Sequence, residues 1–144
     1  MDMTTEVGTR RDVLPRRTLL ARGGVALVLS LGVNWLLLWT VLAVDLVEPF
    51  DPLSYPPVTL LTTAGVIGAT IVYAVLDRRF DNPDRIFVRL AGVVLVLSFL
   101  PDIALLVFDE AATVGAVVVL AGLHVPVAVI CVLVLTGRWS RLLA

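Results

Sequence analysis

Residues 112–136 read ATVGAVVVLAGLHVPVAVICVLVLT and contain no charged side chain. About 20 consecutive apolar residues are enough for a helix to cross the hydrocarbon core of a bilayer. Three further apolar stretches of comparable length occupy residues 23–47, 57–76 and 86–108. The pattern therefore predicts an all-α protein, a bundle of four transmembrane helices over these four ranges.

The composition agrees with a membrane protein. The chain has 144 residues, of which 59% are hydrophobic, and its mean hydropathy is +1.01, whereas soluble domains are about 45–50% apolar. A chain of this length is expected to form one domain. We expect residues 1–21 to form a basic arm, residues 22–138 the transmembrane domain and residues 139–144 a short tail.

Basic residues are confined to alternate connections. All 11 are arginines, and an excess of arginine in short loops marks the cytoplasmic side of a membrane. The distribution predicts a multi-pass protein of the cell membrane with both termini in the cytoplasm and with loops 48–56 and 109–112 outside. The arginines before, between and after the apolar stretches are Arg10, Arg11, Arg16, Arg17, Arg22, Arg78, Arg79, Arg85, Arg89, Arg138 and Arg141, whereas the other connections carry only Asp45, Glu48, Asp51, Asp109 and Glu110.

Two stretches of the chain resemble each other. The tetrapeptide LVLS at residues 27–30 recurs at residues 95–98, and Asn34 then corresponds to Asp102. Parallel repeats build many membrane proteins, so the similarity predicts a repeat of two helices. Chance similarity between apolar sequences is the alternative explanation.

Asp102 is the most unusual residue within a predicted span. A charged side chain at the centre of a transmembrane helix costs roughly 2.5–3.5 kcal/mol on insertion scales. Asp102 should therefore face the interior of the bundle, toward Asn34 or the threonines at 59–63, and be hydrogen-bonded or protonated. Pro101 frees a backbone carbonyl beside it, and Ser98 lies one turn back. The carboxyl is either a proton or cation site or a structural hydrogen-bonding group.

His124 and Asn34 fall near the middle of their predicted spans. Helix geometry puts them about 9 Å deeper than Asp102, so we expect no direct bond between Asp102 and His124. A lone histidine can relay protons or form a structural hydrogen bond to a neighbouring helix. The candidate intramembrane polar site comprises Asp102, His124, Asn34, Thr59, Thr63 and Ser98.

Small residues in the second span predict close helix packing. Gly65 and Ala69 form a small-x-x-x-small pattern, with Gly68 beside it. Such residues let helix backbones approach each other in lipid. We expect the helix at 57–76 to be approached most closely at these positions.

Several function classes find no support in the sequence. One histidine and one cysteine, Cys131, do not supply the three or four ligands of a zinc site. No nucleophile–base pair, phosphate-binding loop or nucleic-acid signature is present, and the polar segments are too short for a catalytic domain. We expect no catalytic residue, no cofactor and no metal.

The chain resembles a family of small bacterial and archaeal membrane proteins known only as a domain of unknown function. The resemblance covers about residues 20–136. It rests on Asn34, on PPVT at residues 56–59, on LSFLPD at residues 97–102 and on Leu123-His124. The family implies four helices and these polar positions, and it implies no activity.

Two functional hypotheses follow from these observations. The first is a non-enzymatic membrane protein with a structural, oligomer-forming or accessory role in a homo-oligomer or larger membrane complex. The alternative is a small transporter or proton- or cation-binding protein that uses Asp102 and His124. The lipid bilayer is the expected partner in both, and nucleic acid in neither.

Overall fold

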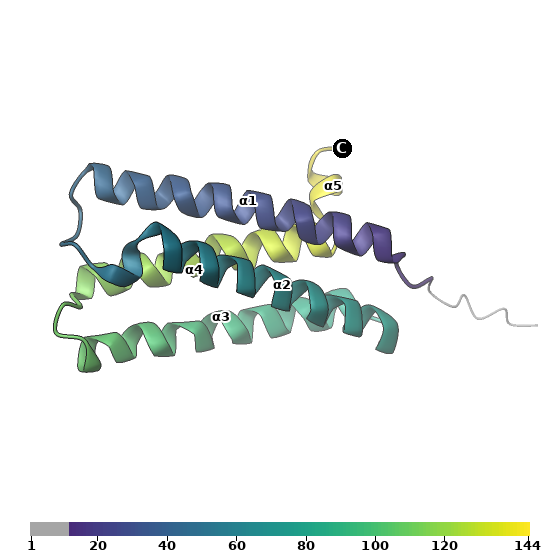
Figure 1. Ribbon diagram of the computed structural model, residues 1–144. Helices are drawn as coiled ribbons and strands as arrows, with labels where there is room; N and C mark the ends of the chain where they lie inside the picture. The colour runs from purple at the N-terminus through teal and green to yellow at the C-terminus, as the bar shows by residue number, and fades with distance from the viewer. Residues whose placement is uncertain (1–11) are drawn as a thin grey trace, which may run out of the picture.

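Four long helices run alternately up and down and pack side by side along their length (Figure 1). The computed structural model describes residues 12–144, and in that part of the chain the elements are helices and loops only. The long helices are α1 (Arg16–Ala43), α2 (Tyr55–Arg79), α3 (Pro83–Phe108) and α4 (Val114–Leu135), and the short elements are the 3-10 helix η1 (Asp51–Leu53) and the terminal α5 (Trp139–Leu142). All four long helices are long and apolar enough to cross a membrane.

Helix boundaries differ from the predicted spans mainly in α1. It begins at Arg16 rather than 23 and ends at Ala43 rather than 47. Apolar content marks the part of a helix that fits in hydrocarbon, whereas arginine, a good helix former, extends the helix beyond it. At the other end, Asp45 has a positive φ of 48° and the chain leaves the helical conformation there. Part of the predicted arm, residues 1–11, lies outside the described residues.

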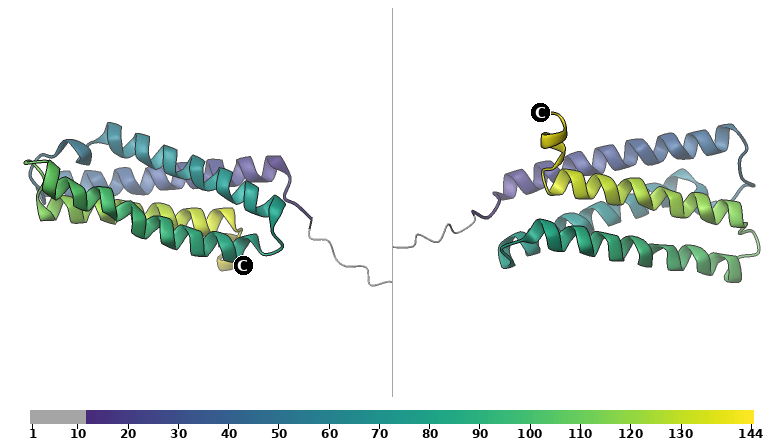
Figure 2. Two further views of the ribbon diagram at one scale, coloured as in Figure 1. Left: turned by 90° about the horizontal axis from the view of Figure 1, so that it is seen from below. Right: turned by 180° about the vertical axis from the view of Figure 1, so that it is seen from behind.

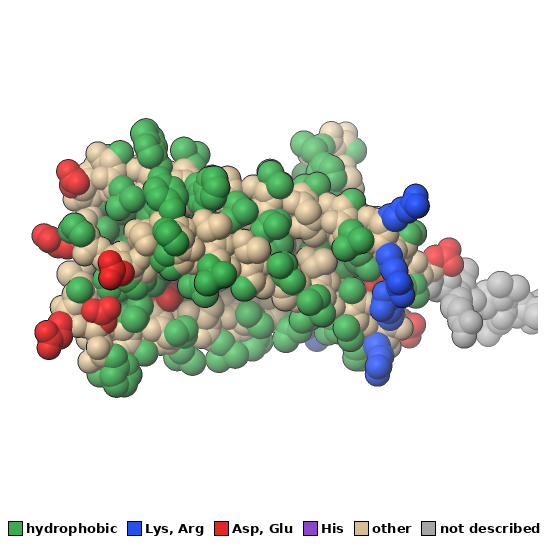
Figure 3. All heavy atoms as spheres, viewed as in Figure 1, with side chains coloured by type: hydrophobic (Ala, Val, Ile, Leu, Met, Phe, Trp, Pro, Cys, Tyr) green, Lys and Arg blue, Asp and Glu red, His purple; other side chains and the backbone are tan. Residues whose placement is uncertain are grey.

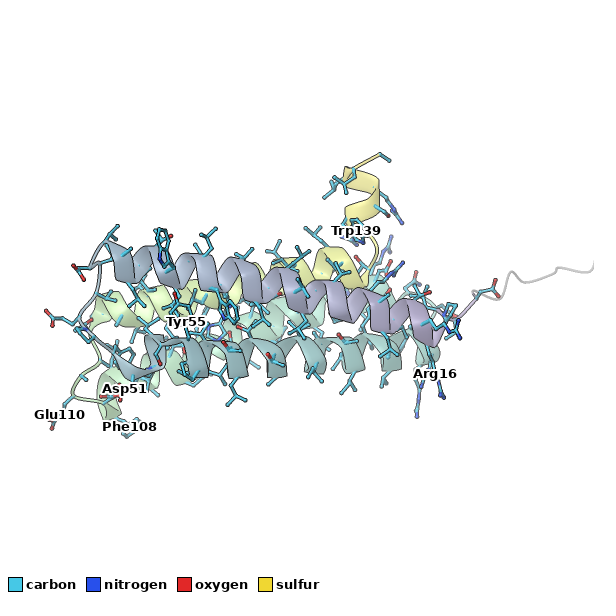
Figure 4. The ribbon with its side chains drawn as sticks, turned by 45° about the horizontal axis from the view of Figure 1, so that its top comes forward. Arg16, Asp51, Tyr55, Phe108, Glu110 and Trp139 are labelled. Atoms are coloured by element: carbon cyan, nitrogen blue, oxygen red, sulfur yellow. The ribbon has the colours of Figure 1, made fainter. Side chains whose placement is uncertain are left out.

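Charged side chains gather at the two ends of the bundle (Figure 3). Arg16 lies at one end, together with the α2–α3 connection and the start of α5, and we call this the arginine end (Figures 1 and 4). Asp51 and Glu110 lie at the opposite end, which we call the acidic end (Figure 4). The surface between the two ends is dominated by hydrophobic side chains (Figure 3).

α1 packs through a stripe of small residues. Its buried positions recur every three or four residues, which places them on one helical face, and they are Leu19, Gly23, Ala26, Ser30, Asn34 and Leu38. At Gly23 the fit is tightest, because a Cβ there would lie 2.9 Å from both Cγ2 and Oγ1 of Thr70 on α2. The absence of a side chain at Gly23 is therefore what lets α1 and α2 approach each other.

The predicted close approach at Gly65 and Gly68 is wrong. A Cβ at either position would meet no atom within 4 Å. A small residue on a helix face permits close packing, but it leaves open space when no neighbouring helix moves in. On α2 the space stays open, and the tight position on this helix is Thr70, which fits against Gly23.

Two apolar clusters fill the interior. One lies toward the arginine end and contains Leu19, Ala26, Val66, Tyr73, Leu76, Phe87, Cys131, Val134 and Leu135. The second lies toward the acidic end and contains Leu38, Phe50, Leu53, Val58, Ala116, Leu120 and Leu123. Along α1, α2 and α4 the residues between the two clusters include the buried polar side chains Asn34 and Thr62 and the partly buried His124.

Hydrogen bonds tie the helix ends together at the arginine end. The backbone N–H of Leu14 donates to Oδ2 of Asp77 at the end of α2, over 2.8 Å. The Arg22 guanidinium on α1 donates to the carbonyl of Leu135, also at 2.8 Å, and so satisfies a free acceptor in the last turn of α4. The chain then turns through Gly137, whose φ of +71° favours glycine.

Gly23→Ala should destabilise the protein, and Gly24→Ala should not. The new methyl at 23 meets Thr70, a stiff β-branched residue whose hydroxyl is bonded to Val66 O at 2.8 Å, and overpacking costs about 1–3 kcal/mol. At Gly24 no atom lies within 4 Å, so alanine keeps only its better helix propensity. Thermal unfolding in detergent measures both, and equal melting temperatures would contradict the packing at Gly23.

Candidate functional site

A groove lies between α2 and α3, with α4 as its floor. It has a volume of about 660 Å³ and an almost wholly apolar lining, within the range of roughly 300–1,000 Å³ found for small-molecule sites. Gly65 and Gly68 on α2 and Val94 on α3 line it and are exposed. This α2–α3 groove therefore opens sideways, toward the surface that faces lipid in a membrane. Figure 2 shows the same helices from below and from behind.

Five polar residues line the groove at a similar depth. Counted along each helix at about 1.5 Å per residue, they lie roughly 9–15 Å from the acidic end. We call them the polar layer: Asn34 on α1, Thr62 on α2, Ser98 and Asp102 on α3, and His124 on α4. Every long helix contributes to this layer.

Asp102 and His124 are in direct contact. Nδ1 of His124 lies 3.3 Å from Oδ2 of Asp102. Asp102 is buried, as the sequence predicts, and is only 5% exposed, whereas the His124 side chain is 30% exposed. The prediction that these two residues would not touch is wrong, and so is the expectation that a threonine of α2 or Asn34 would be the partner of Asp102.

Side-chain direction explains why the depth estimate failed. In a helix each Cα–Cβ bond tilts toward the N-terminus. Helices α3 and α4 are antiparallel neighbours, so Asp102 leans toward the arginine end and His124 leans toward the acidic end. α4 also begins at Val114 rather than 112, which brings His124 nearer its end of the helix. Together the two tilts account for most of the difference in depth between Asp102 and His124 that residue counting gives.

The hydrogen-bond partners of His124 determine which ring nitrogen carries hydrogen. Its Nδ1 lies 3.0 Å from the carbonyl oxygen of Leu120, and a carbonyl can only accept. Nδ1 is therefore the donor to Leu120 O, and Asp102 Oδ2 lies 3.3 Å from the same nitrogen. In neutral His124 this leaves Nε2 as an acceptor. The ring also meets Phe99 edge to face, with centroids 6.4 Å apart, which fixes its orientation.

Asn34 and Thr62 form the second polar pair. Nδ2 of Asn34 donates to Oγ1 of Thr62 over 2.9 Å, within the interior. Asn34 is 2% exposed, and its Oδ1 has no hydrogen-bond partner among residues 12–144. An acceptor buried without a donor costs about 1–3 kcal/mol, so this oxygen is a place where an added donor would stabilise the protein.

The remaining predicted site residues are used locally. The Ser98 hydroxyl donates to Leu95 O of its own helix at 2.6 Å, although Ser98 lines the groove. Thr63 likewise donates to Thr59 O at 2.7 Å. Neither Thr59 nor Thr63 lines the groove, so the structure does not bring these two predicted residues to the site.

Thr62, rather than its neighbours, is the threonine of the polar layer. The hydroxyl of Thr59 instead accepts from the exposed Trp35 indole at 2.9 Å. A signal was present in the sequence, because Val58, Thr62 and Val66 recur every four residues and form the buried face of α2. The predicted residues Thr59 and Thr63 lie on other faces of α2.

The described residues hold no group of three or more histidine, cysteine or acidic side chains that could bind a metal ion. Cys131 is buried in the cluster toward the arginine end. Asp102 and His124 alone supply two ligands. A zinc site needs three or four such ligands.

Comparison with known proteins assigns the chain to a family. A model of the family of unknown function DUF6069 matches residues 9–141. The chain belongs to this family. The family resemblance read from the sequence is confirmed, and the family carries no activity from which a function could be transferred. No curated protein and no solved structure matches the chain.

Thr62→Val should destabilise the protein more than Thr63→Val. Valine at 62 keeps the shape but leaves the Asn34 amide without its acceptor, at a cost of about 1–3 kcal/mol. At 63 the hydroxyl bonds only to a carbonyl of its own helix, which already belongs to the helical hydrogen-bond pattern. Denaturation in detergent compares the two, and a Thr63→Val variant as unstable as Thr62→Val would contradict the role of the Asn34 pair.

Proposed function

We propose that this chain is a multi-pass protein of the cell membrane with both termini in the cytoplasm. Two observations support this topology: four helices are long and apolar enough to cross a bilayer, and the arginines gather at one end of the bundle (Figure 3). Asn34 and Asp102 lie in one polar layer on α1 and α3, which supports the proposed parallel repeat.

Within the membrane we propose that the protein binds protons or a cation and catalyses no reaction. The observation that carries this proposal is the contact between Asp102 and His124 at 3.3 Å, in a groove otherwise lined by apolar side chains. Imidazole is the side chain whose ordinary pKa lies nearest neutral pH, and a carboxyl in contact with it is a second group that can take up a proton. Their pairing in an apolar site is typical of proton-handling membrane proteins.

Charge balance supports the same function. An ionised carboxylate in hydrocarbon requires a partner cation. The arginines lie at the arginine end (Figure 3), so His124 is the only basic side chain that lines the groove with Asp102. The pair therefore needs a proton, or a cation in its place, to stay neutral.

The surroundings of the pair support binding rather than catalysis. A hydrolytic site needs a nucleophile beside its base. The nearest hydroxyl on α3, that of Ser98, donates to a backbone carbonyl, and Thr62 accepts from Asn34. Within residues 12–144, neither hydroxyl forms a hydrogen bond with His124.

One observation favours the second candidate, a structural or oligomer-forming subunit. Gly65, Gly68 and Ala69 form an open strip of small residues along the groove, and such strips accept a helix of another subunit in lipid.

Cysteine cross-linking through Gly68→Cys, on a Cys131→Ala background, tests this role. Covalent dimers in native membranes would support it.

Topology can be tested with single cysteines, because the native Cys131 is buried and can be replaced by alanine. In intact cells, Ser54→Cys between η1 and α2 should react with a membrane-impermeant maleimide, since its connection is acidic. Asn82→Cys between α2 and α3 should react only after the membrane is opened. Labelling of Asn82→Cys but not of Ser54→Cys in intact cells would reverse the proposed orientation.

Proton binding at Asp102 can be tested by infrared spectroscopy. We expect the carboxyl absorption of the wild type to change between acidic and alkaline pH with a component that Asp102→Asn lacks. In His124→Gln this component should move in frequency, because the contact at 3.3 Å between His124 Nδ1 and Asp102 Oδ2 is lost. Identical pH-difference spectra for the wild type and Asp102→Asn would contradict proton binding.

A further inference from the structure

We propose that the α2–α3 groove binds an amphiphilic ammonium, an amine with a positive charge and an apolar chain. The charged nitrogen would lie at Asp102, and the chain would lie along the groove toward Phe87. This inference rests on the proposed function, because it names the class of cation that the Asp102–His124 site takes.

The polar layer selects a ligand that donates hydrogen bonds. Its donors are largely engaged: Asn34 Nδ2 with Thr62, the Ser98 hydroxyl with Leu95 O, and His124 Nδ1 with Leu120 O and Asp102. Two of its acceptor oxygens are not engaged in hydrogen bonds. The buried Asn34 Oδ1 has no partner, and Asp102 Oδ2 has only the histidine contact at 3.3 Å.

An ammonium group satisfies both needs of this layer. It offers several N–H donors, and its positive charge compensates the carboxylate of Asp102, in a groove that no arginine lines. A hydroxyl headgroup would supply a donor without a charge. A carboxylate headgroup would place a second negative charge beside Asp102.

The rest of the groove selects an apolar chain. From Asp102 to Phe87 the groove follows α3 for 15 residues, about 22 Å at 1.5 Å per residue. Its volume of about 660 Å³ has no further charged side chain in its lining. Because the groove opens sideways at Gly65 and Gly68, a ligand dissolved in the bilayer can enter it without crossing water.

Binding of the ammonium should exchange with a proton. Besides Asp102, the polar side chains that line the groove are Asn34 on α1, Thr62 on α2 and Ser98 on α3, which do not titrate, and His124 on α4. A proton on Asp102, or on His124 beside it, neutralises the pair, so an incoming ammonium displaces one proton to keep the site neutral. Affinity should therefore fall as the pH is lowered.

Dodecylammonium is the probe, added to the full chain in nanodiscs of zwitterionic lipid, with binding followed by the increase in melting temperature. Three molecules with the same chain separate the contributions of the headgroup. Dodecyltrimethylammonium has charge but no N–H and should bind at least tenfold more weakly, whereas dodecanol and dodecanoate should give no increase above their effect on Asp102→Asn. Equal increases with dodecanol would overturn the proposal, because apolar contact alone would then explain binding.

Two substitutions test the two parts of the site, the charge and the apolar groove. Asp102→Asn removes the charge, and Gly65→Leu fills the groove, where no atom lies within 4 Å, while leaving Asp102 in place. Each should weaken dodecylammonium binding at least tenfold. Gly32→Leu is the matched control, because Gly32 is exposed, has the same open space and lies outside the groove, and it should bind as the wild type does.

The outcomes distinguish this inference from the proposed function. If dodecylammonium does not bind but the Asp102 carboxyl still titrates in the infrared, the ligand class is wrong and proton binding stands. If the carboxyl does not titrate and dodecylammonium binds Asp102→Asn as well as the wild type, both fail. A covalent dimer through Gly68→Cys that forms equally with and without the amine would show that a second copy occupies the groove and would overturn the inference.

Discussion

Helices surrounded by hydrocarbon gain little by burying large apolar side chains, because lipid is as apolar as leucine. What brings them together is close backbone approach, and in this chain α1 provides it through Gly23, Ala26 and Ser30. Thr70 of α2 fits into the notch at Gly23. By contrast, almost none of the apolar face of α3 is buried. The rest of the architecture follows from this difference, because α3 contacts α4 more extensively than it contacts α2, and the groove lies between α2 and α3.

Buried polar groups in native proteins nearly always have partners. In the polar layer two oxygens depart from that rule: Asn34 Oδ1 has no partner and Asp102 Oδ2 has only a long contact. Both residues line the same groove. Unsatisfied acceptors scattered through a bundle would merely destabilise it, whereas acceptors on residues that line one groove support the proposed site for a hydrogen-bond donor.

The sequence predicts the architecture well because span length and arginine placement are one-dimensional signals. The number of helices, their approximate ranges and the burial of Asp102 can all be read from it. The Asp102–His124 contact could not be, because it depends on side-chain tilt in two antiparallel helices, and residue counting places atoms only on helix axes. The choice of Thr62 over Thr59 and Thr63 likewise depends on which face of α2 meets its neighbours.

The glycines show the same limit of prediction from sequence. Gly23 and Gly65 are equivalent as sequence, since each is a small residue on an apolar helix. One lies against Thr70 and the other lines open space. Whether a small residue closes an interface or opens a groove is decided by the helix opposite, so a pattern within one helix does not determine which outcome occurs.

Hydrogen bonds between helices close the arginine end of the bundle. At the arginine end the Tyr73 hydroxyl donates to Asp84 at 2.7 Å and links α2 to α3, and Arg22 links α1 to α4. The arginines that orient a chain in a membrane are thus partly occupied in closing this end, and they lie far from the polar layer. Asp102 is therefore left with the only histidine of the chain as its basic partner. No arginine lines the groove with this carboxyl, which is why we propose that it is neutralised by something that comes and goes, either a proton or a cation that enters from the bilayer.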